Sequence, residues 1–106
     1  MSNESLMNAL RDFVSERDWS QFHTPENLAK SISIEAAELL ELFQWAEPSN
    51  VDDVKDELAD VLTYCLLMVD RLGLDFEEII RKKLDKTISK YPVEASKGMS
   101  VKYDRL

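Results

Sequence analysis

The sequence predicts an all-α fold. Apolar residues recur at helical spacing in four segments, and no segment alternates with the two-residue period of a strand. The two glycines, Gly73 and Gly98, do not mark hairpins. With 106 residues, 44% of them hydrophobic, the chain has the length of one compact domain. We therefore expect a single domain, residues 1–106, with a fold like a four-helix bundle.

The first two helices are predicted from periodicity and capping signals. Apolar residues at helical spacing define a first helix that ends near residues 17–18: Leu6, Leu10, Phe13 and Val14. A polar and aromatic connector follows over residues 19–23. Thr24 and Pro25 then resemble an N-cap and a first helical position. This second helix is expected to continue to about Glu47 and to stop at Pro48.

The remaining helices have comparable signals. Ser49 with Asp52 resembles a capping box for a third helix, residues 51–72, which ends at Gly73. Asp75 with Glu78 resembles a second capping box, and it opens a fourth helix that ends near Tyr91. Residues 92–106 are expected to form an irregular tail. The short turn between the second and third helices makes them antiparallel neighbours.

Composition excludes several classes of protein. There are 13 basic and 21 acidic residues, and the net charge of −8 disfavours nucleic-acid polymers and anionic membrane surfaces as partners. No segment reaches the length of a membrane span, no signal peptide is recognisable, and Cys65 is the only cysteine. We expect a cytoplasmic protein. Because a domain of this size has a thin core, we also expect a homodimer or homotetramer.

Four acidic residues on the second and third helices are the candidates for chemistry. Glu35 and Glu38 lie one turn apart on the second helix, and Glu57 and Asp60 lie one turn apart on the third. Glu35 falls within the apolar stripe of its helix, where an unpaired carboxylate is costly. Carboxylates facing one another across two helices need cations, and oxygen ligands favour Mg²⁺, with Mn²⁺ as a possible substitute.

The acidic pattern also fits other interpretations. Acidic pairs in an acidic protein can simply form solvated helix faces. A di-iron carboxylate bundle needs Glu-x-x-His pairs, and neither helix contains a histidine. A non-catalytic acidic interaction module and a metal-binding bundle without turnover stay open as alternatives.

The spacing of the acidic pairs also resembles a known family. Glu35-Ala-Ala-Glu38, then eighteen residues, then Glu57-Leu-Ala-Asp60 resembles the EXXE and EXXD signature of MazG-like, all-α nucleoside triphosphate pyrophosphohydrolases. Four further stretches resemble the dCTP pyrophosphatase branch of that family: residues 17–23, residues 38–45, Lys90-Tyr91-Pro92 and Lys102-Tyr103.

The resemblance implies a function and a set of site residues. It implies Mg²⁺-dependent hydrolysis of a nucleoside triphosphate, dCTP or a similar pyrimidine, to the monophosphate and pyrophosphate. Glu35, Glu38, Glu57 and Asp60 would hold the metal. For the mechanism, we expect Glu38 or Glu41 to accept the proton of the attacking water. The substrate would be bound by Trp19, Gln21, Phe22, His23, Trp45, Tyr64, Lys83, Lys90 and Tyr91.

Two positions depart from the family pattern. Leu10 stands where close eukaryotic relatives carry a histidine that contacts the base, and Thr87 stands where many relatives carry an asparagine. Loss of a hydrogen-bond donor to the base edge predicts looser selectivity among bases.

Overall fold

The computed structural model describes residues 3–47 and 50–106, and every regular element within them is helical. The elements in chain order are α1 (Asn3–Glu16), η1 (Ser20–Phe22), α2 (Pro25–Glu41), α3 (Val51–Arg71), α4 (Phe76–Lys90), α5 (Val93–Ser96) and η2 (Tyr103–Arg105). The expectation of an all-α fold is therefore confirmed. The chain forms two compact units, one up to Leu74 and one from Asp75 to Leu106.

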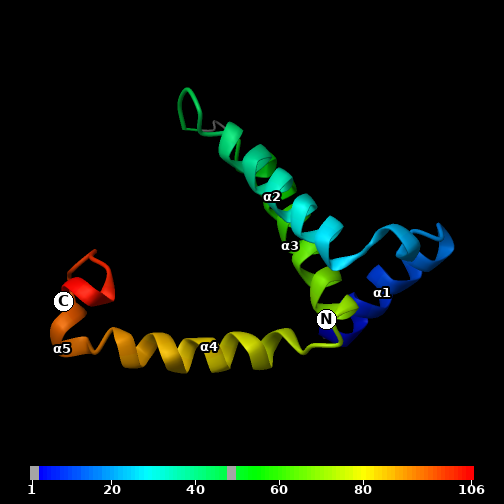
Figure 1. Ribbon diagram of the computed structural model, residues 1–106. Coiled ribbons are helices and arrows are strands. Elements are labelled where there is room, and N and C mark those ends of the chain that lie inside the picture. The colour runs from blue at the N-terminus through cyan, green and yellow to red at the C-terminus, as the bar shows by residue number, and fades with distance from the viewer. Residues whose placement is uncertain (1–2, 48–49) are drawn as a thin grey trace. The chain divides into compact units, whose positions relative to one another are not determined.

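The first unit is built on the pair α2 and α3. These helices run side by side and antiparallel, as the short connection predicts, and α1 packs against α3 (Figure 1). Its buried hydrophobic residues in the described chain are Met7, Val14 and Leu28. This core is small, as expected from the chain length.

Helices α1 and α3 each end in a tight turn that contains one residue in the left-handed conformation. After α1, Asp18 adopts a left-handed conformation with φ 53, and the Trp19 and Asp18 N–H groups donate to the carbonyls of Val14 and Ser15. After α3, Gly73 has φ 67, and the next N–H, that of Leu74, donates to the carbonyl of Val69. Both are Schellman motifs. The predicted stop at Gly73 is confirmed, while the turn at Asp18 uses an aspartate where glycine is commoner.

The predicted N-caps of α2 and α4 are confirmed. The Thr24 side chain accepts a hydrogen bond from the Asn27 N–H, and Pro25 is the first residue of α2. The Asp75 carboxylate accepts from the Glu78 N–H at 2.9 Å. These caps satisfy N–H groups that have no partner within the helix.

Two predicted boundaries differ from the structure. The second helix ends at Glu41 rather than near Glu47, because the Leu42, Phe43 and Gln44 N–H groups donate to carbonyls three residues back and the α-helix tightens into turns. The N-cap of α3 is Asn50, whose side chain accepts from the Asp52 N–H; the predicted cap Ser49 and the predicted stop Pro48 lie outside the described residues.

The second unit contains α4 and the tail. The tail is not wholly irregular as predicted, because it contains α5 and η2. Tyr91 holds it: its hydroxyl oxygen accepts a hydrogen bond from the Tyr103 N–H at 3.1 Å, and the two rings meet edge to face. Lys90 Nζ lies 4.7 Å from the centre of the Tyr103 ring, a cation–π contact. No described helix is long and apolar enough to cross a membrane.

Candidate active site

Three of the four predicted metal ligands meet between α2 and α3. Glu35, Glu57 and Asp60 each offer a carboxylate oxygen, and these oxygens all lie within 4.8 Å of one another. We call these three residues the carboxylate cluster. Glu35 and Glu57 are partly buried and Asp60 is exposed, so the cluster is open to solvent on one side.

The fourth predicted ligand, Glu38, borders the cluster. The Glu38 carboxylate is the largest cause of a raised pKa at Glu35, and together with burial and the charges of Asp60 and Glu57 it raises that pKa to about 7. Burial raises the pKa of Glu57 above its ordinary value, and the charges of Glu38, Asp60 and the neighbouring Asp56 and Glu41 add to this. The electrostatics therefore disfavour ionised carboxylates in the metal-free protein.

The cluster has the properties expected of a divalent cation site. Glu35 Oε2 and Glu57 Oε2 are buried and lack hydrogen-bond partners, although buried polar atoms are normally paired. Ligand oxygens bonded to one Mg²⁺ at 2.0–2.1 Å lie about 3 to 4 Å apart, a range inside the 4.8 Å limit within which these three oxygens lie. A hard cation would supply the missing partner of both oxygens and offset the repulsion. The donor set and its geometry therefore fit such an ion.

An aromatic cavity adjoins the cluster. It has a volume of about 210 Å³ and is lined by Leu10, Phe13, Trp19, His23, Asp60, Thr63, Tyr64 and Leu67. Asp60 belongs both to this cavity and to the carboxylate cluster. Trp19 packs edge to face against Phe13 and against His23, with ring centres 5.4 and 6.5 Å away. The cavity is smaller than the pockets that hold whole drug-sized ligands, and its lining suits one flat ring.

The structure gathers some of the predicted substrate-binding residues here and leaves others elsewhere. Trp19, His23 and Tyr64 line the aromatic cavity. Gln21 and Phe22 do not line it: Gln21 Nε2 donates to the carbonyl and carboxylate oxygens of Asp18, and the Phe22 carbonyl accepts from Asn27 Nδ2.

Four further predicted residues do not line the aromatic cavity. Trp45 follows α2 and is 89% exposed. Lys83 lies on α4 beside an apolar groove, and Lys90 and Tyr91 contact the tail within the second unit.

Sequence reasoning missed some residues of the cavity wall. Thr63 and Leu67 follow Asp60 by three and seven residues on α3, so they share its face. That spacing was a usable signal. Phe13 lies three residues after Leu10 on α1, and its helical spacing indicates only that it belongs to the apolar face of its helix.

Comparison with known proteins shows what the chain is similar to. Residues 30–106 match the MazG-like family. Proteins named dCTP pyrophosphatase 1 from Rattus norvegicus and Homo sapiens are 34% and 33% identical to the chain, over 97% of the chain and 66% of each relative. The chain thus spans just under two thirds of the length of these relatives.

A solved structure is similar over most of the fold. The crystal structure of a pyrophosphatase from Archaeoglobus fulgidus DSM 4304 matches with a TM-score of 0.79 and 43% identity, covering 84% of this chain and 91% of that one. The acidic signature, the all-helical fold and these matches together show that the chain belongs to the MazG-like family.

Proposed function

We propose that this protein is a nucleotide pyrophosphohydrolase that converts a nucleoside triphosphate to the monophosphate and pyrophosphate. The observation that carries the proposal is the shared position of Asp60, which joins a cluster suited to a cation to a cavity suited to a base. A nucleotide with its base in the cavity would have its phosphates near the cluster. The names of the relatives in Rattus norvegicus and Homo sapiens and of the Archaeoglobus fulgidus structure support the same activity.

The carboxylate cluster and Glu38 would hold the metal, Mg²⁺ with Mn²⁺ as a substitute. When bound, such an ion neutralises the triphosphate and lowers the pKa of a coordinated water. Glu35 and Glu57 would offer their unpaired oxygens to the ion, and Asp60 would add a third ligand. Without the ion, the acidic site would repel a polyanionic substrate.

Glu38 and Glu41 are the candidate proton acceptors. Glu38 is close enough to raise the pKa of Glu35, and the charge of Glu41 is close enough to raise the pKa of Glu57. Both side chains are exposed on α2, so they can reach a water beside the cluster.

The base is proposed to be a pyrimidine, with dCTP as the first candidate. Trp19 supplies an aromatic wall, Tyr64 a second polar and aromatic contact, and His23 a hydrogen-bonding edge. Leu10 occupies the wall where a donor to the base would otherwise sit, so discrimination among bases should be loose. Trp45, Gln21, Phe22, Lys83, Lys90 and Tyr91 stay candidates for contacts with the rest of the substrate.

We propose a homodimer or homotetramer as the active assembly, in the cytoplasm. The first unit exposes large apolar side chains that a monomer would leave in water: Leu6, Ile34, Leu40, Phe43, Val51, Leu58 and Leu62. A monomeric mass by light scattering at micromolar concentration would contradict this. The exposure of Trp45 is compatible with a place at such a contact.

The decisive assay offers the eight common ribo- and deoxyribonucleoside triphosphates with Mg²⁺ and separates the products. Monophosphate plus pyrophosphate is expected, with pyrimidines preferred. Orthophosphate release would contradict the cleavage position, and a purine preference would contradict the base. Metal binding without turnover of any triphosphate would favour a metal-binding bundle, and neither binding nor turnover would favour an interaction module.

A further inference from the structure

The aromatic cavity has two walls that come from different segments of the first unit. One wall consists of Leu10 and Phe13 on α1 with Trp19 and His23 in the connector that follows. The other consists of four residues of α3: Asp60, Thr63, Tyr64 and Leu67. The width of the cavity therefore depends on the spacing between α1 with its connector and α3.

Contacts within the wall on α1 and its connector tie its residues together. The Trp19 N–H donates to the Val14 carbonyl at 3.0 Å, and the Trp19 ring packs on that of Phe13. His23 packs against Trp19 in turn. A shift of α1 would therefore carry the whole wall with it.

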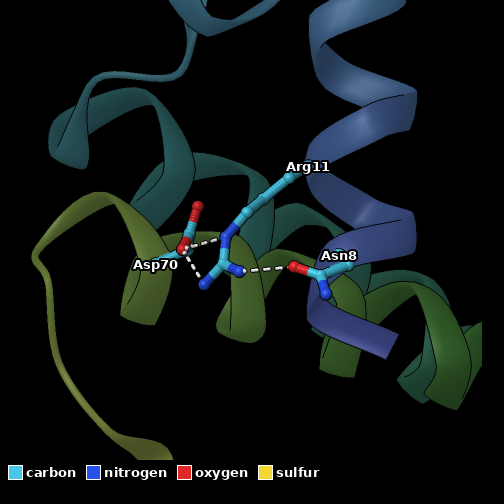
Figure 2. A network of polar contacts seen from close by, with 3 residues as sticks. All are labelled: Asn8, Arg11 and Asp70. Atoms are coloured by element: carbon cyan, nitrogen blue, oxygen red, sulfur yellow. Dashed lines mark hydrogen bonds and ion pairs between the residues drawn. The ribbon is translucent and has the colours of Figure 1, made fainter. Parts of the chain in front are cut away.

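One ion pair joins α1 and α3, the helices from which the two walls are built. Arg11 follows Leu10 on α1, and its Nε and Nη2 both lie 2.8 Å from Oδ1 of Asp70 near the end of α3. Its third nitrogen, Nη1, donates to Asn8 Oδ1 at 2.9 Å, so the whole guanidinium is held (Figure 2). Arg11 and Asp70 are 59 residues apart, whereas every other ion pair among the described residues joins positions at most four apart.

Other polar links between these segments are weaker. Arg71 Nη1 reaches the Ser20 carbonyl at 3.5 Å, at the limit of a hydrogen bond. The Arg11 and Asp70 side chains are 50% and 32% exposed, so their ion pair is partly shielded from solvent. It also has two short contacts, each of 2.8 Å. Such a pair can fix a geometry even where its contribution to global stability is small.

We propose that Arg11 and Asp70 are positioning residues that hold the two walls of the aromatic cavity at the spacing a nucleobase needs. This inference rests on the proposed function, because it assigns the cavity to the base. The pair acts through Leu10, Phe13 and Trp19 and does not touch the carboxylate cluster, which is carried by α2 and α3. It should therefore control substrate affinity and leave the chemical step unchanged.

The test compares Arg11→Met with a matched control, Arg81→Met. Arg81 makes a similar pair, with its Nε 3.2 Å and its Nη2 3.1 Å from Oε1 of Glu77. Both of these residues lie on α4, so their pair does not join α1 to α3. Methionine keeps most of the apolar stem in each case. Arg11→Met should raise KM about three- to fivefold, the range available to a partly exposed ion pair, with kcat changed less than about twofold. Arg81→Met should change neither.

Variants of the partner residue sharpen the result. Asp70→Asn should raise KM as Arg11→Met does, and the double variant should raise it no further, because either change breaks the same pair. The exchanged pair, Arg11→Asp with Asp70→Arg, should recover most of the lost affinity. High salt should raise KM of the wild type more than that of Arg11→Met.

A second readout needs no catalysis. In a Trp45→Phe background, Trp19 is the only tryptophan, and acrylamide quenching of its fluorescence reports access to the cavity wall. Arg11→Met should increase quenching, and Arg81→Met should not. If the wild type turns over no triphosphate, the proposed function fails, and the quenching result alone decides whether the pair holds the wall. An unchanged KM in an active Arg11→Met enzyme, equal effects of both arginine variants, or unchanged quenching would overturn the inference.

Discussion

Replacing Glu57 by glutamine tests the metal site most directly. The change keeps the shape of the side chain and removes the charge of one of three carboxylates whose oxygens lie within 4.8 Å of one another. Glu57 Oε2 is one of the two buried oxygens without a partner, so a bound cation would contact it directly. Loss of residues that only support a ligand costs about 10- to 100-fold in metal affinity, and loss of a charged ligand should reach at least the upper end, about 100-fold.

This loss has a measurable effect on stability. At a Mg²⁺ concentration of about 100 Kd, binding stabilises the wild type by about 2.7 kcal/mol, since the gain is RT ln(1 + [L]/Kd). With affinity about 100-fold lower, Glu57→Gln is then near its own Kd and gains only about 0.4 kcal/mol. The difference of about 2.3 kcal/mol corresponds to roughly 10 °C in Tm for a domain of this size.

The assay is a thermal melt of metal-free protein with added Mg²⁺, at one fixed protein concentration. Without metal, Glu57→Gln should melt at or above the wild-type Tm, because burial and the charges of Glu38 and Asp60 already raise the pKa of Glu57 and disfavour its ionised form. Pyrophosphate release should fall with metal affinity. Asp56→Asn is the matched control: it removes a neighbouring exposed carboxylate of α3 outside the cluster and should keep both properties.

The reasoning would be refuted by a Glu57→Gln protein that keeps the wild-type Tm response to Mg²⁺. An equal loss in Asp56→Asn would refute it as well, because the effect would then follow net charge and not the identity of a ligand. A lower Tm of Glu57→Gln without metal would contradict the repulsion inferred for the cluster.

Three further predictions concern affinity, packing and pH. Trp45→Ala should weaken substrate binding by about ten- to a hundredfold while leaving Mg²⁺ binding intact, and unchanged nucleotide affinity by calorimetry would place Trp45 outside the site. Leu28→Ala should destabilise the fold by about 2–4 kcal/mol in urea denaturation, because Leu28 is only 1% exposed, and a loss below about 1 kcal/mol would contradict its place in the core. In the metal-free protein, Glu35 has its pKa raised from 4.5 to about 7, so its contribution to stability is complete below pH 4.5 and is lost as the pH rises through 7. The urea midpoint of the wild type should be lower at pH 8 than at pH 5. Glu35→Gln should make this difference smaller. An equal difference in both proteins would disprove the assignment of the pH dependence to Glu35.

Local signals in the sequence predicted most of the helix boundaries. Thr24 and Asp75 cap their helices through hydrogen bonds to N–H groups three residues ahead, and Gly73 ends α3 in a conformation that glycine adopts readily. These interactions span a few residues, so the identity of those residues determines them. The facing acidic pairs were also predictable, because helical periodicity places i and i+3 on one side.

Only the tertiary structure decided how these parts meet. Asp60 serves both the carboxylate cluster and the aromatic cavity because α1 packs beside α3, which no periodicity within one helix indicates. Arg11 meets Asp70 across 59 residues, and Trp19 reaches the cavity while Trp45 does not line it. Such contacts depend on the packing of whole helices, where small apolar contributions from many residues add together. The sequence by itself therefore determined the helices, two of their N-caps and the facing acidic pairs, whereas the packing of α1 on α3 determined which side chains form the cavity.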